Sequence, residues 1–326
     1  MKTEILKKLK MAGTYVSGQA LCEEFGVSRT AVWKAVRQLQ EEGYSIEAVR
    51  NRGYRYQESG DIYTEAGIKS QLHTRIAGQN LAFYQETDST NNQARKLAEK
   101  GAPDGTLVIA VTQTAGKGRR GRSWASPGGD GIWMSLLLRP SFGPEAASML
   151  TLVAAMAVEQ GIRRTTGLEC GIKWPNDLVA DGRKLCGILT EMSTEGDDIR
   201  YVVVGIGINV GIREFPPELQ DKATSLYLCQ KETVSRSRLV AEVMEAWEKY
   251  YDIFNQTLDL QNLRQEYNRK LINTGKLVTV LASTDTCTGT ALGIDAQGKL
   301  LVELEDGHVR EVMSGEVSVR GVYGYV

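Results

Sequence analysis

Two stretches of the chain carry residue types that bind anions or small polar rings. The first, "TDSTNN", supplies the small donors and acceptors Ser89, Thr90 and Asn91 directly before a helical pattern. The second, "GKGRRGRSWASPGG" at residues 116–129, joins glycines and four cations to a single Trp124. It has neither the P-loop spacing nor the strand and helix setting of a dinucleotide fingerprint. Its glycines would let the backbone approach a ligand, and its cations would neutralise phosphate.

Two further stretches could complete such a site. In "KWPNDLVADGRKLCGIL", Lys184 begins a largely apolar strand, where a partly desolvated ammonium acts strongly on a neighbouring anion. In "VVVGIGINV", Gly205 and Gly207 interrupt a buried strand, which indicates close approach by a ligand or another backbone. Asn209 in the same run is a polar amide that requires partners.

Each stretch also has a simpler interpretation that the residues alone leave open. "TDSTNN" could be no more than a helix N-cap turn. The basic stretch could be a solvated loop, and Lys184 could be a surface lysine beside a turn.

The elements that would position these residues follow from hydrophobic periodicity. A strand is expected at "LAFYQET", and the later patterns alternate irregularly between strand and helix, which indicates an α+β domain with a mixed sheet. The predicted strands span residues 106–113, 131–138, 171–173, 184–190 and 200–210, and the predicted helices span 91–100, 145–165 and 234–256.

The first sixty residues have a different organisation. Apolar spacing predicts three helices, with Gly26 ending the second and Ser28 capping the third. A hairpin that turns at residues 51–53 follows. This order resembles a winged helix-turn-helix DNA-binding domain, in which the third helix enters the major groove and the hairpin contacts the backbone. The residues expected on the DNA are Ser28, Arg29, Thr30, Trp33, Lys34, Arg37, Arg50 and Arg52. A three-helix interaction module is the alternative.

Composition sets limits on the class of protein. The 326 residues suggest two or three domains, and residues 1–56 carry a net charge of +4 within a chain of net charge −1. The five scattered cysteines and two histidines argue against a disulfide framework or structural zinc. No apolar run approaches the ~18 residues of a membrane span, so we expect no membrane partner and a cytoplasmic protein.

Taken in order behind the winged helix, "TDSTNN", "GKGRRGRSW", "KWPNDL" with "RKLCGIL", and "GIGINV" resemble the bifunctional biotin-protein ligase and biotin-operon repressor family. The resemblance implies a DNA-binding domain at 1–62, a catalytic α/β domain with a mixed sheet at 63–272, and an SH3-like β-barrel at 273–326. It also implies that biotin and ATP, with Mg²⁺, form biotinyl-5'-AMP. Biotin then passes to a lysine of a carrier domain, as in acetyl-CoA carboxylase or pyruvate carboxylase. The adenylate acts as corepressor for a homodimer on operator DNA.

The same resemblance assigns roles to residues. Lys184 and Arg119 would be catalytic, and Asp177 would hold the metal. The nucleotide would contact Arg119, Arg122, Trp124, Asn176 and Asn209. Biotin would contact Ser89, Thr90, Asn91, Gln113, Lys117, Gly118, Arg119, Lys184, Gly205 and Gly207.

Two other functions compete with this interpretation. A repressor could sense biotin without transferring it, although retention of Lys184 and the whole loop argues against that. A lipoate-protein ligase shares the architecture, but the polar set at residues 89–91 suits a ureido ring better than an apolar dithiolane. At Lys117 the chain departs from the family, which usually has arginine there, so this position keeps the charge but lacks the planar fork of a bidentate contact.

Overall fold

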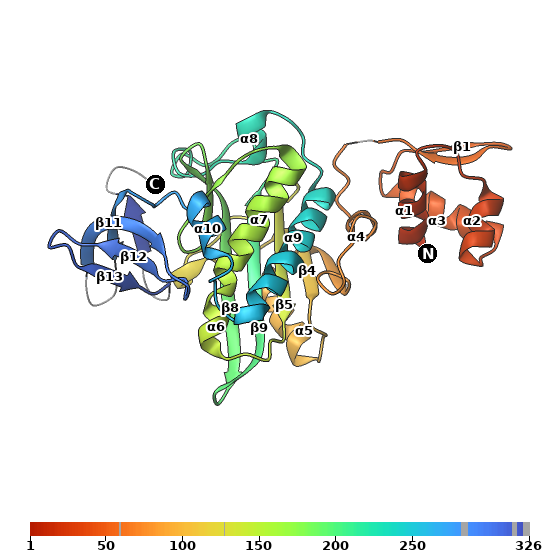
Figure 1. Cartoon of the computed structure of the whole chain (residues 1–326). Helices are drawn as coiled ribbons and strands as arrows, with labels where there is room; N and C mark the ends of the chain where they lie inside the picture. The colour runs from red at the N-terminus through yellow and green to blue at the C-terminus, as the bar shows by residue number, and fades with distance from the viewer. Residues whose placement is uncertain (59, 127, 282–285, 315–317, 322–326) are drawn as a thin grey trace. The chain divides into compact units, whose positions relative to one another are not determined.

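The computed structural model describes residues 1–58, 60–126, 128–281, 286–314 and 318–321. The chain forms two compact units. Unit 1 contains residues 1–73 and 235–241, and unit 2 contains residues 74–234 and 242–326. Figure 1 shows the elements of both. The domain boundaries at residues 62 and 272 stay predictions.

Unit 1 begins with the predicted helices and hairpin: α1 (Lys2–Ala12), α2 (Gly18–Phe25), α3 (Arg29–Glu41), β1 (Ile46–Val49) and β2 (Gly53–Tyr56). Gly26 ends α2 in the left-handed conformation, and the Ser28 hydroxyl accepts a hydrogen bond from the Ala31 backbone N–H, so both predicted helix signals are confirmed. Helix α3 buries Val32 and Val36, which leaves its opposite side exposed.

The segment after the hairpin is more ordered than its polar sequence indicates. Thr64 caps a short helix, α4 (Glu65–Lys69), that the sequence did not reveal. Asp61 accepts hydrogen bonds from the backbone and the guanidinium of Arg236, whose cation lies 4.4 Å from the ring centroid of the buried Tyr63. Charge pairing and ring burial anchor this segment within unit 1.

Unit 2 is built on a seven-stranded mixed sheet in the order β3-β4-β5-β9-β8-β7-β6, which confirms the predicted class. Strands β3 and β4 are parallel and all other neighbours are antiparallel. The strands are β3 (Leu81–Thr87), β4 (Thr106–Gln113), β5 (Gly131–Leu138), β6 (Gly171–Lys173), β7 (Asp177–Ala180), β8 (Arg183–Glu195) and β9 (Asp198–Asn209). The sequence missed β7, because its four residues lie between two turns.

Helices support this sheet. The helix predicted at 145–165 is interrupted at Met149, and α9 begins two residues after its predicted start. Helix α7 is buried along most of its length, and Figure 1 shows it lying across the sheet. The helices of this part are α5 (Thr90–Glu99), α6 (Pro144–Ser148), α7 (Leu150–Thr166), α8 (Leu226–Gln230), α9 (Arg236–Thr257) and α10 (Arg264–Lys270). Residues 236–241 of α9 belong to unit 1.

The C-terminal part of unit 2 is a five-stranded antiparallel sheet in the order β13-β12-β11-β10-β14. Its strands are β10 (Leu277–Leu281), β11 (Thr286–Ile294), β12 (Leu300–Glu303), β13 (Val309–Val312) and β14 (Ser318–Gly321). Residues 282–285 and 315–317 of the predicted β-barrel domain lie outside the described residues. Closure into an SH3-like barrel stays a prediction. Within the described ranges, none of the helices is both long and apolar enough to span a membrane.

A helical glycine tests how tightly α7 packs on α9. A Cβ at Gly161 would lie 2.5 Å from Val243 Cγ2 and 2.9 Å from the Val243 backbone nitrogen. Helix propensity alone makes Gly161→Ala stabilising by about 1 kcal/mol, whereas overpacking costs about 1–3 kcal/mol. Because backbone atoms cannot withdraw, we expect net destabilisation by about 1–2 kcal/mol in urea unfolding.

The matched control is Gly18→Ala in α2, where the new Cβ would lie 3.7 Å from the Tyr54 ring, an ordinary contact. Its effect should stay within about 0.5 kcal/mol. A stabilised Gly161→Ala variant would show that propensity outweighs packing between the two helices.

Candidate functional site

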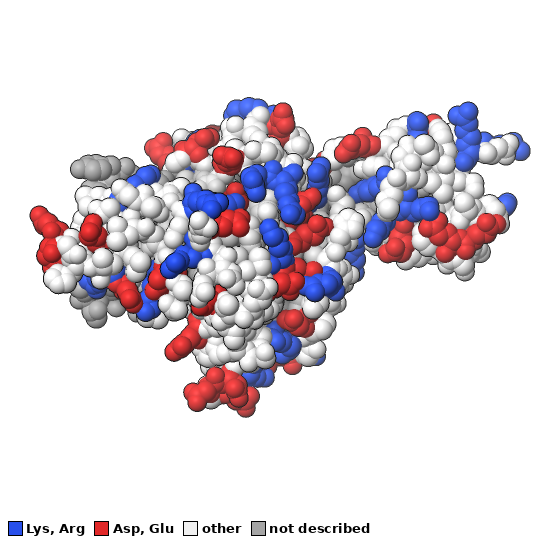
Figure 2. Space-filling model, in the orientation of Figure 1, with Lys and Arg blue, Asp and Glu red and all other residues white. Residues whose placement is uncertain are grey.

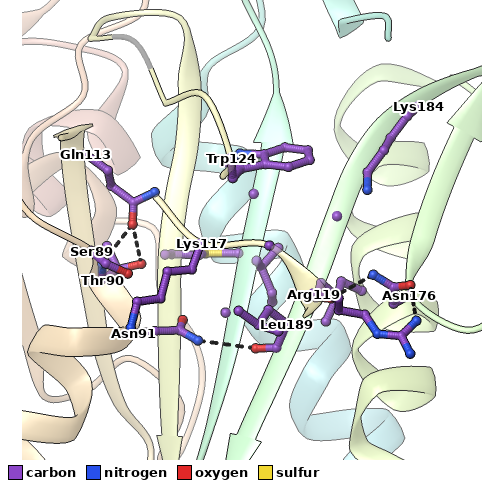
Figure 3. A pocket seen from close by; sticks show the side chains of 17 residues that line it. Ser89, Thr90, Asn91, Gln113, Lys117, Arg119, Trp124, Asn176, Lys184 and Leu189 are labelled. Carbon is purple, nitrogen blue, oxygen red and sulfur yellow. Dashed lines mark hydrogen bonds between the residues drawn. The ribbon is translucent and has the colours of Figure 1, made fainter. Parts of the chain in front are cut away.

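A pocket in unit 2 brings the separate sequence motifs together. All ten residues expected to contact biotin line this pocket, and so do Trp124 and Asn176. Figure 3 shows Ser89, Thr90, Asn91 and Gln113 on one side, and Arg119, Asn176 and Lys184 on the other, with Trp124 between the two groups. The β3–α5 junction and the end of β4 supply the first side, and the loop after β4, the turn between β6 and β7, and β8 supply the second.

On the first side, the polar groups hydrogen-bond to one another. The Gln113 carbonyl oxygen accepts from the Thr90 backbone N–H at 2.8 Å and from its hydroxyl at 3.1 Å. The Gln113 amide nitrogen donates to Ser126 Oγ at 2.7 Å. Ser89 is the N-cap residue of α5 but makes no capping bond, so the N-cap interpretation does not account for its hydroxyl.

The side-chain oxygen and nitrogen of Asn91 are both hydrogen-bonded. Its oxygen accepts a 2.6 Å hydrogen bond from the fully buried Ser135 hydroxyl, and its nitrogen donates to Glu191 at 2.7 Å. A Cβ at Gly205 would lie 2.2 Å from that amide oxygen. The close approach inferred for Gly205 is therefore made by Asn91. Ser135 is the one polar residue in "GIWMSLLL", and its position in an apolar strand could have predicted that it bonds a buried polar group.

Asp88 anchors the beginning of α5 beneath this wall. Burial alone raises the pKa of Asp88, but hydrogen bonds from Asn92, Gln93 and backbone N–H outweigh it and place the pKa well below its ordinary value. The ionised carboxylate therefore stabilises the fold above the pKa of the unfolded chain, and this contribution is lost as the pH falls. Asn92 in turn accepts a 2.7 Å hydrogen bond from Lys117 Nζ, which ties the basic loop to α5.

On the second side, residues 176–177 hold the two cations expected to be catalytic. Asn176 Oδ1 accepts from Arg119 Nη1 at 2.9 Å, and the other Arg119 nitrogen donates to the Ser314 carbonyl at 2.6 Å. Burial lowers the pKa of Arg119, and Asp177 acts in the opposite direction. Lys184 Nζ lies 2.6 Å from Asp177 Oδ1.

Trp124 fills the centre of the pocket. A Cβ at Gly207 would lie 2.7 Å from the indole nitrogen, and one at Gly187 would lie 3.0 Å from the ring. The indole N–H is buried without a hydrogen-bond partner, a cost of about 1–3 kcal/mol. The remaining cavity is about 50 Å³, against roughly 300–1,000 Å³ for small-molecule sites. A ligand must therefore displace the loop or the indole.

Three predicted site residues are absent from the lining that the described residues form: Arg122, Asn209 and Asp177. Arg122 is exposed, and the buried Asn209 amide donates to the Thr224 carbonyl at 3.0 Å. Their roles with nucleotide stay predictions. The sequence missed five lining residues, most of them apolar and therefore without a chemical signal: Met134, Gly187, Ile188, Leu189 and Ile206.

The donor set near Asp177 bears on the predicted metal. Among the described residues, no group of three His, Cys, Asp or Glu side chains could hold a metal ion. One carboxylate still fits Mg²⁺, because this ion takes one or two carboxylates and completes its octahedron with substrate phosphates and water. Asp177 is the candidate ligand.

Unit 1 presents a second candidate site on α3 and the hairpin. All eight residues expected on DNA are exposed. Trp33 is 49% exposed, and the Arg37 guanidinium lies 5.3 Å from the centroid of its ring. An exposed tryptophan on a helix whose other face is buried has no packing role, so its surface is available to a partner.

The hairpin cations are partly ordered by an aromatic residue. Figure 2 shows Lys and Arg side chains gathered over this hairpin. Arg52 and Arg55 lie 5.7 and 4.9 Å from the Tyr15 ring centroid, and Arg55 also forms a 2.8 Å ion pair with Glu47. Arg50 and Arg52 make no ion pair among those found in the described part of the chain, which suits phosphate contact.

Three family models match the chain. They are the Biotin/lipoate A/B protein ligase family over residues 83–209, an HTH domain over residues 2–55, and the Biotin protein ligase C terminal domain over residues 274–320.

Similar proteins match over almost the whole length. The Bifunctional ligase/repressor BirA of Bacillus subtilis is 39% identical over 322 residues, 98% of each chain. That of Escherichia coli is 32% identical over 310 residues, 94% of each chain. Among solved structures, the biotin protein ligase from Aquifex aeolicus in complex with biotin and ATP is 31% identical, with a TM-score of 0.66, and the match covers 74% of this chain and 99% of that one.

The position of Trp124 can be tested directly. Gly207→Ala should expel the indole, because the new methyl group would overlap its nitrogen. We expect the Trp124 emission, obtained by subtracting the spectrum of the matching Trp124→Phe protein, to shift to longer wavelength and to be quenched more by acrylamide. In Gly211→Ala the new Cβ would lie 3.4 Å from its nearest neighbour, and the emission should not change. An unchanged spectrum in Gly207→Ala would place the indole elsewhere in solution.

Proposed function

The chain belongs to the family of biotin protein ligases that are also DNA-binding repressors, and we propose that the two walls of its pocket divide the recognition of biotin from its activation. As a member of this family, it uses ATP to activate biotin and transfers biotin to a protein, and it also binds DNA as a repressor. Which residues carry each step is the proposal developed below.

The first wall suits the ureido ring of biotin. This ring offers two N–H donors and one carbonyl acceptor, each costly to bury without a partner. Gln113 and Thr90 are already bonded to each other, and Gln113 also bonds to Ser126, so an entering ring exchanges partners with groups in the right place. Asn91, which is held by Ser135 and Glu191, shapes the wall that the ring contacts.

The second wall carries the charge needed for adenylation. A biotin carboxylate oxygen attacks the α-phosphorus of ATP, and the bond to pyrophosphate breaks, so negative charge accumulates on oxygens that Lys184 and Arg119 neutralise. These two cations lie on the wall opposite the ureido-binding groups. Mg²⁺, held by Asp177 and phosphate oxygens, would supply further neutralisation.

Transfer requires a second attack. The neutral amine of a carrier lysine attacks the carbonyl carbon of biotinyl-5'-AMP, and AMP leaves with the bonding electrons. None of the described lining residues is Asp, Glu or His, so the pocket wall itself supplies no obvious base. We propose that the acceptor is the carrier domain of acetyl-CoA carboxylase or pyruvate carboxylase, and that the protein acts in the cytoplasm.

One observation carries the assignment of roles: a ureido-compatible Thr90–Gln113 pair and the cations Arg119 and Lys184 line one pocket. The purified protein should catalyse exchange of labelled pyrophosphate into ATP only when biotin is added. The matched family model covers lipoate enzymes too, so lipoate is the discriminating substrate. Exchange with lipoate but not biotin would overturn the specificity.

Lys184→Ala should lower this exchange by at least about a hundredfold, because one strong electrostatic contact to the transition state is worth about 3 kcal/mol. The variant should remain folded, although its unfolding temperature should be lower because Asp177 loses its counter-ion. The control is Lys222→Ala, which removes an exposed lysine whose ammonium bonds only a nearby carbonyl among the partners found. Full activity of Lys184→Ala would remove this residue from the mechanism.

We further propose that biotinyl-5'-AMP links the two sites. Closing the basic loop over the adenylate creates surface for homodimerisation, and two copies of unit 1 then bind an operator with two half-sites. With biotin and ATP, the dimer fraction should rise in sedimentation, and affinity for a selected two-half-site duplex should tighten by about tenfold or more. Trp33→Ala should weaken DNA binding without lowering the dimer fraction. Equal dimer fraction and DNA affinity with and without ligand would refute the link.

A further inference from the structure

Lys184 lies on the pocket wall where the substrate carboxylate is expected, and its ammonium pairs with Asp177, which is outside the lining. The Lys184 and Asp177 side chains are 23% and 15% exposed, so neither charge is fully solvated. The lysine ammonium also lies 5.0 Å from the ring centroid of Trp124. A Cβ at Gly187 would lie 3.1 Å from the same ammonium, which is tighter than an ordinary contact, so the glycine gives the ammonium room at this position.

The strands are arranged to bring these two charges together. Strands β7 and β8 are antiparallel, and Val179 pairs with Lys184 across a bulge. Directly paired residues point to the same face, and alternate residues along a strand share a face. Asp177 and Lys184 therefore project from one face of β7 and β8. The bulge, which adds Leu185, is what sets this register.

The Asp177 carboxylate has a role that does not require a metal ion. An ammonium that is partly desolvated and unpaired is costly, so the ligand-free pocket needs an internal anion. A substrate carboxylate that binds Lys184 competes with that anion and is repelled by it. Burial lowers the pKa of Arg119, and the Asp177 carboxylate opposes that shift, so its field reaches both cations.

We propose that Asp177 is a positioning residue: it holds Lys184 as its counter-ion in the ligand-free site and gives Lys184 up to the carboxylate of biotin when biotin binds. This proposal rests on the proposed function, because it takes biotin as the ligand. In the ligand-free protein, Asp177 prevents the ammonium from rotating into solvent. On binding, the exchange of one carboxylate for another leaves the net charge at Lys184 satisfied throughout.

The test is equilibrium binding of biotin, without ATP or Mg²⁺, to the full-length Asp177→Asn protein. Removing the competing charge should tighten biotin binding by about fivefold or more. Biotinamide, which lacks the carboxylate charge, should bind the variant and the wild type equally. Asp181→Asn is the matched control, since it removes one exposed charge from the same hairpin at a backbone position (φ 50°) that asparagine accepts, and it should leave biotin affinity unchanged.

A double-mutant cycle separates pairing from a general charge effect. In a Lys184→Gln background, Asp177→Asn should no longer tighten biotin binding, because the competed cation is gone. In pyrophosphate exchange, Asp177→Asn should lower both KM for biotin and kcat, since Lys184 is easier for the carboxylate to reach but less well positioned.

Each result that would contradict the counter-ion proposal has a different meaning. Unchanged or weaker biotin binding by a folded Asp177→Asn protein would overturn the counter-ion role, and so would equal tightening for biotinamide. A shift only in the Mg²⁺ concentration needed for exchange would assign Asp177 to the metal instead. Absence of biotin binding by the wild type would overturn the proposed function itself.

Discussion

The pocket is governed by one constraint: the buried groups that we propose to hold an anion and a polar ring must also find partners within the protein. Unpaired polar groups cost about 1–3 kcal/mol each when buried, and uncompensated charges cost more. The chain meets this requirement from within. Gln113 and Thr90 bond each other, Arg119 bonds Asn176, and Lys184 pairs with Asp177. On the proposed roles, ligand binding is an exchange of hydrogen-bond and charge partners, so affinity depends on how well the two walls are positioned.

Positioning depends on glycines that face those side chains. Gly205 admits the Asn91 amide, Gly207 admits the Trp124 indole, and Gly187 admits both the indole and the Lys184 ammonium. Because β8 and β9 are neighbours, Gly187 and Gly207 lie directly opposite each other and form one smooth strip of sheet. A methyl group on this strip would displace a functional side chain before it touched any ligand. The same strip would let a flat ligand lie against the backbone.

The sequence predicted most of this architecture because its signals were local. The bounds of β4, β5 and β6 agree with the predicted strands, and the caps at Gly26 and Ser28 form as expected, since buried alternation and cap chemistry act over a few residues. What it missed required tertiary information. Strand β7 lies between two turns that obscure its pattern, and α4 lies in a polar segment. The support of Asn91 by Glu191 joins residues a hundred positions apart, which no local period reveals.

Lys117 shows how the same logic treats a departure from the family pattern. Arginine offers a planar fork that suits two acceptors, whereas lysine offers a compact charge that suits one. Among the described residues, Lys117 Nζ meets one acceptor, the side-chain oxygen of Asn92, and Asn92 is fixed in turn by Asp88. Because a side-chain amide presents one oxygen, the lysine loses nothing at this contact by lacking a fork. The hydrogen bond from Lys117 to Asn92 therefore holds the basic loop against α5. Arg119, on the opposite wall, uses two guanidinium nitrogens to bond two acceptors.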